Sequence, residues 1–260
     1  MSATPRIGIV GIGSLGRRVA QSVVDAGLPL VVFDERADAL EAFVDVATLA
    51  VSARELATTC DIVGVCVGDD EQVLDVVTGL DGLLEGARPG TVICIQGTMH
   101  PATCEVLSRV VAHHGVDLVD APVIVDSYAV EPTYTVAVGG SAETLARCRP
   151  YFRAIARDAV LTGPVGSAMT AALVHALSAA ARQSLDHDTA RVAAALGLDD
   201  AVTAGLLGAG VLVALDPHAQ KDIGIARRVV AEQEPSDSLL SLAAARGALL
   251  VAPGSPTFIS

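Results

Sequence analysis

The sequence predicts an α/β protein in which a doubly wound parallel sheet is followed by an all-helical C-terminal domain. Over residues 1–163, short apolar runs alternate with segments of helical periodicity, which is typical of a mostly parallel sheet. Apolar residues make up 52% of the chain but aromatic residues only 3%, so small aliphatic side chains must build the core. After Gly163 the strand signal ends and the chain becomes rich in alanine.

The first predicted unit runs strand, turn, helix, strand. Residues 6–10 and 30–33 are apolar runs, and between them lie a glycine-rich stretch and the helical periodicity of residues 17–26. This spacing favours a right-handed crossover between parallel strands. Further strands are predicted at 62–67, 91–95, 117–119 and 135–138, and helices at 69–78 and 101–114.

The change of pattern predicts two domains, an α/β domain over residues 1–163 and a helical domain over residues 164–260. Residues 167–196 are rich in alanine and have helical periodicity, and helical segments recur to about residue 250. The tail, residues 253–260, is rich in Pro, Gly and Ser, and we expect it to be mobile.

Charge and cysteine content exclude several classes of partner. A net charge of −13 disfavours nucleic acid and anionic membrane surfaces. No uncharged apolar stretch is long enough for a membrane span, and the first residues lack a signal-peptide layout. The five cysteines lack metal-ligand spacing, so we expect buried thiols in the reducing cytoplasm and no metal site.

The glycine-rich turn has the pattern G-x-G-x-x-G. It follows a predicted strand and opens a predicted helix, which is the context of the dinucleotide-binding fingerprint of a Rossmann domain. The first glycine permits the tight turn, the second lets the backbone approach a pyrophosphate, and the third lets helix and strand pack closely. The helix N-terminus offers N–H groups and a positive dipole end to the phosphates. The six residues are Gly11, Ile12, Gly13, Ser14, Leu15 and Gly16.

An acidic residue closes the second predicted strand. Asp34 is placed to accept hydrogen bonds from the adenosine ribose hydroxyls and would repel a 2′-phosphate, so the sequence favours NAD over NADP. Arg36 leaves NADP open, because an arginine there can hold a 2′-phosphate. We expect Asp34, Glu35 and Arg36 to contact the cofactor.

With these motifs in place, the chain resembles the β-hydroxyacid dehydrogenase superfamily, whose best-known member is 3-hydroxyisobutyrate dehydrogenase and which has imine reductases as structural relatives. The resemblance runs from residue 6 to about residue 228. Its landmarks, beside the glycine turn, are residues 61–70, 97–101, 120–123, 163–167 and 221–224.

The resemblance implies hydride transfer. In the family an N-terminal Rossmann domain holds the nicotinamide, and a helical domain, often completed by a second subunit, covers it; a homodimer acting on a small molecule is therefore expected. The resemblance further implies cofactor contacts at Val67, Thr98 and Lys221.

The chain departs from the family where the substrate binds. The slot of the family's proton-transferring lysine falls on Ala172, which cannot transfer a proton. The Ser-Gly-Gly that binds a substrate carboxylate is replaced by Ile124, Val125 and Asp126, and the serine before Thr98 is replaced by Gly97. We therefore expect a less anionic and bulkier substrate than a small hydroxy acid.

Three residues are candidates for the missing proton donor. His175 lies three residues after Ala172, hence on the same helix face, and histidine titrates near neutrality. Lys221 is the only lysine among 17 basic residues, and a buried lysine changes its pKa readily. Asp126 is the third candidate. Each of the three residues also has a purely structural interpretation. Substrate contacts are expected at Ile124, Val125, Tyr128 and Ala172, and Tyr134 lies in the same segment.

The sequence therefore predicts an NAD(P)-dependent dehydrogenase or reductase that acts on a C–O bond with a non-lysine proton donor. Imine reduction is an alternative, because an iminium substrate arrives already protonated. A non-catalytic NAD(H)-binding protein is an alternative from another class, since fold alone does not establish function.

Overall fold

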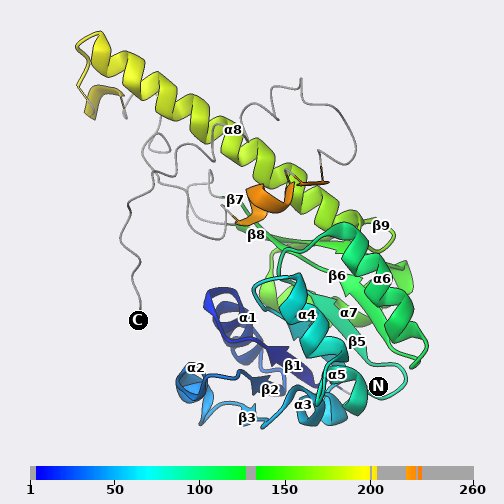
Figure 1. The fold of residues 1–260 in the computed structure, drawn as a ribbon. Helices are drawn as coiled ribbons and strands as arrows, with labels where there is room; N and C mark the ends of the chain where they lie inside the picture. The colour runs from blue at the N-terminus through cyan, green and yellow to red at the C-terminus, as the bar shows by residue number, and fades with distance from the viewer. Residues whose placement is uncertain (1–3, 127–132, 200, 204–220, 227, 230–260) are drawn as a thin grey trace. The chain divides into compact units, whose positions relative to one another are not determined.

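The computed structural model describes residues 4–126, 133–199, 201–203, 221–226 and 228–229 (Figure 1). Contacts within the chain divide it into two compact units, Met1–Ala172 and Leu173–Ser260. The division falls inside the long helix α8 (Ser167–Ala195), beyond the turn at residues 164–166. A folding domain that ends at Gly163 stays a prediction.

The first unit is built on one sheet with the strand order β3-β2-β1-β4-β5-β6-β8-β7, and β9 pairs with β8. The strands β1 to β6 are parallel to one another, while β8 is antiparallel to both β6 and β7. The order reverses direction at β1, which has β2 on one side and β4 on the other. The strands are β1 (Ile7–Val10), β2 (Leu30–Phe33), β3 (Thr48–Leu49), β4 (Ile62–Val65), β5 (Val92–Ile95), β6 (Asp117–Asp120), β7 (Val123–Asp126), β8 (Thr133–Gly139) and β9 (Asp158–Gly163).

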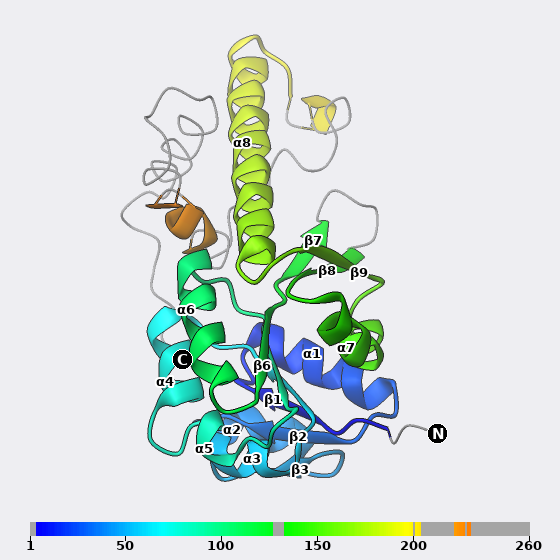
Figure 2. The same cartoon turned by 90° about the vertical axis from the view of Figure 1, so that its right-hand side faces the viewer.

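Helices cover both faces of this sheet, so every residue of β1, β4 and β5 is buried. Figure 2 shows α4 and α6 on one side of the strands and α1 and α7 on the other. This arrangement confirms the predicted doubly wound sheet. The helices of the unit are α1 (Ser14–Asp25), α2 (Ala37–Leu40), the 3-10 turn η1 (Glu41–Phe43), α3 (Ala53–Thr59), α4 (Asp70–Thr78), α5 (Leu83–Gly86), α6 (Pro101–Ala112) and α7 (Ala142–Ile155).

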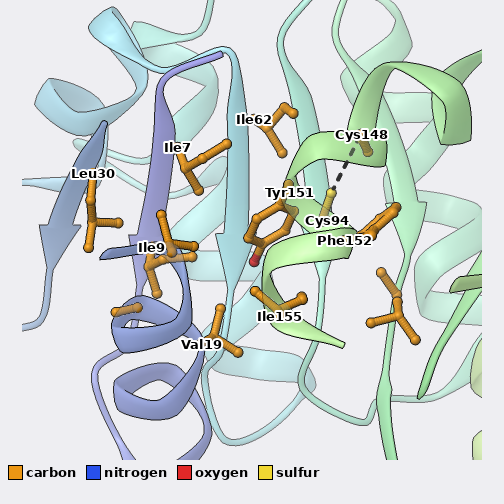
Figure 3. Close-up of a cluster of buried hydrophobic side chains, with 14 of the residues drawn as sticks. Ile7, Ile9, Val19, Leu30, Ile62, Cys94, Cys148, Tyr151, Phe152 and Ile155 are labelled. Carbon is orange, nitrogen blue, oxygen red and sulfur yellow. Dashed lines mark hydrogen bonds between the residues drawn. The ribbon is translucent and has the colours of Figure 1, made fainter. Parts of the chain in front are cut away.

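The face covered by α1 and α7 holds the larger side chains of the core. Ile7 and Ile9 of β1 face Val19 of α1, while Tyr151 and Phe152 enter from α7 (Figure 3). All five cysteines are free thiols, and four of them are buried, as the sequence predicts: Cys60, Cys94, Cys104 and Cys148. The Sγ atoms of Cys94 and Cys148 lie 4.0 Å apart in this core.

Several elements of the first unit were missing from the sequence prediction. The strand β9 leaves nearly all of its residues exposed, and its apolar run, residues 159–161, is only three residues long. The helix α7 contains Pro150 and was not recognised, although Tyr151, Phe152 and Ile155 bury one face of it. The strand β7 contains Ile124 and Val125, which the sequence prediction treated only as substrate contacts.

The described part of the second unit is helical, in agreement with the prediction. Leu173, Leu177 and Ala180 of α8 pack against Ile223 and Ile225 of the helical stretch 221–226. The predicted helices beyond residue 229 and the tail lie outside the described residues. Within the described ranges, no helix combines the length and the apolar character that crossing a bilayer requires.

Asp120, at the end of β6, ties the sheet to the start of α8. Its side chain is fully buried, and its two carboxylate oxygens accept hydrogen bonds from the backbone N–H groups of Gly166 (2.9 Å) and Met169 (2.8 Å). A side chain on Gly139 would overlap this carboxylate, so glycine is required there. Burial raises the pKa of Asp120, and the hydrogen bonds from the backbone oppose that rise.

Replacing Asp120 by asparagine tests this contact. Asparagine keeps the shape but offers one acceptor instead of two, so we expect Asp120→Asn to lower the free energy of unfolding by about 1–3 kcal/mol in urea titrations. Because the folded-state pKa of Asp120 is raised, the wild type gains stability from this group as the pH falls through that pKa. The stability difference between the two proteins should therefore widen between pH 7 and pH 4. A stability difference that stays constant or shrinks over this pH range would contradict a raised pKa of Asp120.

Candidate functional site

The turn between β1 and α1 is shaped by Gly11. Its φ is +86°, a conformation that favours glycine, and its N–H donates to the Phe33 carbonyl at 2.9 Å. A Cβ on Gly11 would lie 2.8 Å from the carbonyl oxygen of Cys66. The turn therefore runs close to the loop that leaves β4.

The other two glycines of the motif have different surroundings. A Cβ on Gly16 would overlap the Gly11 carbonyl oxygen and lie 3.2 Å from the Cβ of Cys66, so the first turn of α1 packs directly on the loop after β1. A Cβ on Gly13 would have no atom within 4 Å, and its φ of −71° suits any residue. Packing within the protein therefore explains Gly11 and Gly16 but leaves Gly13 unexplained.

The start of α1 also differs from that of α3, α4 and α7. In α3, α4 and α7, the N-cap side chains of Ser52, Asp69 and Ser141 accept a hydrogen bond from the helix's own first turn. The N-cap of α1 is Gly13, which has no such side chain, and the first turn of α1 contains no acidic residue. The positive end of this helix dipole suits an anionic group, and the open space at Gly13 fits the pyrophosphate of a dinucleotide.

Asp34 is fixed beside this turn. Its Oδ2 accepts a hydrogen bond from the N–H of Ile12 at 2.6 Å, and its Oδ1 accepts one from the N–H of Arg36 at 2.9 Å. The Asp34 side chain is only 11% exposed, whereas that of Arg36 is 63% exposed, with Nε 3.5 Å from Oδ1. Glu35 is exposed. Asp34 therefore presents a fixed carboxylate at the end of β2.

The loops after β4 and β5 continue the same edge of the sheet. Val67 and Thr98 are both half-buried, and a Cβ on Gly97 would overlap the carbonyl oxygen of Val67. Gly97 therefore permits a contact between the two loops that a serine would block. The structure brings the glycine turn, Asp34, Val67 and Thr98 to the carboxyl ends of four neighbouring strands, where open α/β sheets bind their ligands.

The segment expected to contact the substrate is the antiparallel strand β7. Ile124 pairs with Thr135 and Val125 with Tyr134, while Asp126 is the last residue of the strand. Tyr134 stacks against the Arg18 guanidinium, whose Cζ lies 3.8 Å from the ring centroid, so this tyrosine has a structural partner. Tyr128 lies outside the described residues.

The remaining candidates lie on α8 and in the second unit. Ala172 is half-buried and ends the first unit, and His175 is exposed on the same helix in the second. Lys221 opens the stretch 221–226, which packs on the part of α8 that contains Leu173 and Leu177. Lys221 therefore belongs to a segment that packs beside the turns of α8 that contain His175. Their roles in proton transfer stay predictions.

A buried polar cluster at the carboxyl edge escaped the sequence prediction. Gln96 follows β5 and is 2% exposed; its Oε1 accepts hydrogen bonds from the Tyr151 hydroxyl at 2.8 Å and from the Cys66 thiol at 3.1 Å. The signal was present as a glutamine directly after four apolar strand residues, but its partners come from distant segments of the chain.

Comparison with known proteins independently supports a dinucleotide-binding domain. Residues 6–164 match the family model described as the NAD binding domain of 6-phosphogluconate dehydrogenase. An uncharacterized oxidoreductase of Mycobacterium tuberculosis strain H37Rv is 31% identical over 246 residues, which cover 92% of this chain and 80% of that protein.

Two solved structures share the fold. A 3-hydroxyisobutyrate dehydrogenase from Mycobacterium tuberculosis, determined with L-serine, has a TM-score of 0.80 at 23% identity and covers 95% of this chain and 94% of its own. An imine reductase variant from Myxococcus stipitatus in complex with NAD+ has a TM-score of 0.65 at 17% identity, covering 91% and 81% of the two chains. The chain belongs to the family of the NAD binding domain of 6-phosphogluconate dehydrogenase and, with it, to the β-hydroxyacid dehydrogenase superfamily of NAD(P)-dependent oxidoreductases.

Proposed function

We propose that the protein is an NAD-dependent oxidoreductase that transfers hydride to or from a C–O bond of a small or moderately bulky substrate. The observation that carries this proposal is the open space at Gly13, beside the start of a helix whose N-cap has no side chain. A bound nicotinamide supplies or accepts the hydride. The backbone at the start of α1 binds the pyrophosphate, and Asp34 binds the adenosine ribose.

The preference for NAD rests on Asp34. Its carboxylate is held by two backbone N–H groups, so it cannot turn away from a 2′-phosphate without losing them. Arg36 places its charge on the same carboxylate, with Nε 3.5 Å from Oδ1. A 2′-phosphate would have to compete with Asp34 for this arginine, which favours NAD.

Because alanine stands at position 172, where the family has its lysine, another residue must transfer the proton. We assign proton transfer to His175, with Lys221 and Asp126 as the remaining candidates. Histidine suits this role because its ordinary pKa lies near neutrality. Ile124 and Val125 offer no polar side chain for a substrate carboxylate, which supports a less anionic substrate. Imine reduction is the second candidate. The lack of a lysine at position 172 supports it, because an iminium substrate arrives already protonated.

Two further properties belong to the proposal. A homodimer is supported by the apolar side chains of Val174, Leu185 and Val192, which α8 leaves exposed in the single chain. A cytoplasmic location is supported by the five cysteines, all of which are free thiols.

The glycine motif gives the first test. We expect Gly13→Ala to keep the melting temperature of the wild type, because its Cβ meets no protein atom, but to weaken NADH binding about tenfold or more. Gly16→Ala should lower the free energy of unfolding by about 2 kcal/mol or more through overlap with Gly11. Calorimetric titration and thermal melts measure both. Unchanged NADH affinity in Gly13→Ala would show that the pyrophosphate lies elsewhere.

Cofactor choice gives the second test. We expect Asp34→Asn to reduce the ratio of NADH affinity to NADPH affinity by about tenfold, because the repelling charge is removed while the shape is kept. Arg36→Ala should leave NADH affinity within about twofold, since an exposed ion pair contributes little. A wild type that prefers NADPH and loses this preference in Arg36→Ala would contradict the proposal.

Turnover gives the third test. NADH oxidation would be measured with carbonyl and cyclic imine substrates, and NAD reduction with 3-hydroxyisobutyrate and L-serine. His175→Ala should lower kcat about 100-fold at unchanged NADH affinity. His187→Ala is the matched control, since this histidine is also exposed on α8. Loss of activity in both variants would refute a specific role for His175, and an inert wild type that binds NADH would favour the non-catalytic alternative.

A further inference from the structure

The buried cluster around Gln96 lies between two loops of the proposed cofactor site. Gln96 is followed by Gly97 and Thr98, and its partner Cys66 is followed by Val67. The backbone N–H groups of Gln96 (2.9 Å) and Gly97 (3.3 Å) both donate to the Val65 carbonyl. The side chain of Gln96 therefore joins two loops that the backbone has already brought together.

Cys66 extends this connection to the glycine turn. Its N–H donates to the carbonyl of Val10 at 2.8 Å, and its backbone leaves no room for a side chain on Gly11. Gln96, through Cys66, is thus linked to the turn that we propose binds the pyrophosphate. The Oε1 atom of Gln96 thus joins the ends of β4 and β5, and the backbone of Cys66 joins β4 to β1.

Tyr151 fixes the cluster from the other side. Its ring is fully buried in the core beside α7 (Figure 3). Its hydroxyl donates to Gln96 across Gly64 of β4, where a Cβ would overlap that hydroxyl. Burial raises the pKa of the Cys66 thiol to about 12 and that of Tyr151 well above its ordinary value, so both groups keep their protons. Both therefore serve as donors to the oxygen of Gln96.

One atom of the cluster is a buried donor that lowers the stability of the fold. Gln96 Nε2 is buried and has no hydrogen-bond partner within the described part of the chain. A buried donor without an acceptor is unfavourable by about 1–3 kcal/mol, so an apolar residue of the same size would satisfy the fold better. The presence of glutamine is better explained by the position of the two loops than by stability.

The strand order indicates which part of the dinucleotide these loops meet. Asp34 follows β2 and the glycine turn follows β1, so the adenosine ribose and the pyrophosphate occupy that side of the edge. The chain of the dinucleotide then continues over β4 and β5, the next strands in the order β2-β1-β4-β5. Val67 and Thr98 accordingly lie under its nicotinamide half.

We propose that Gln96 is a positioning residue for the nicotinamide half of the cofactor, acting through the loops of residues 66–68 and 97–98. This inference rests on the proposed function, because it requires a dinucleotide along the edge. Gln96 holds the two loops at one separation, and Tyr151 holds Gln96.

The test compares NADH with ADP-ribose, which lacks the nicotinamide. We expect Gln96→Met to weaken NADH binding about tenfold, because the loops under the nicotinamide lose the hydrogen bonds that hold them, while ADP-ribose affinity stays within about twofold. Tyr151→Phe, which removes one bond, should weaken NADH binding about threefold, and the double variant should fall short of the product of the two effects. General loss of stability would weaken both ligands alike.

Thr91→Val provides the matched control. Thr91 is buried just before β5, at the opposite end of the same strand, and its hydroxyl accepts a hydrogen bond from the Arg88 N–H at 3.3 Å. This variant should leave both affinities within about twofold. If Gln96→Met and Tyr151→Phe weaken neither ligand, or both ligands equally, the positioning role is refuted while the proposed function stands. A wild type that binds neither ligand would overturn the proposed function as well.

Discussion

The first turn of α1 lies so close to the loop after β1 that no side chain fits at Gly16. This contact fixes where α1 begins, and the proposed pyrophosphate site is formed by the backbone at the start of this helix. The same close packing includes the backbone of Cys66, so the loops after β1 and β4 cannot shift independently. Gly13, between the two constrained glycines, is the glycine of this motif at which an added Cβ would meet no protein atom.

Two buried polar groups extend this rigidity across the sheet. Asp120 joins the end of β6 to the start of α8, and Gln96 joins the ends of β4 and β5 to α7. Each is buried in an otherwise apolar surrounding, where hydrogen bonds are strong and unpaired groups are costly. These hydrogen bonds therefore hold the carboxyl ends of β4, β5 and β6 to the helices α7 and α8.

Much of the fold, and the place of the candidate cofactor site at the carboxyl edge of the sheet, was predictable from the sequence. The apolar runs of β1, β2, β4 and β5 and the motif from Gly11 to Gly16 are local signals, and Asp34 stands at a position that the strand pattern fixes. The helix α7 was missed because Pro150 interrupts its pattern, and β9 because its apolar run, residues 159–161, is only three residues long. The Gln96 cluster was missed because Cys66 and Tyr151 reach Gln96 only after folding. The proton donor could not be assigned from the sequence, because neither His175 nor Lys221 lies in a motif that marks a catalytic residue.

The most direct test of the central claim is a crystal structure of the protein with NADH. The account predicts the pyrophosphate beside Gly13, within hydrogen-bond distance of backbone N–H groups at the start of α1. It also predicts the adenosine ribose hydroxyls on the carboxylate of Asp34. A dinucleotide bound away from this turn, or with its adenosine ribose turned away from Asp34, would contradict the account.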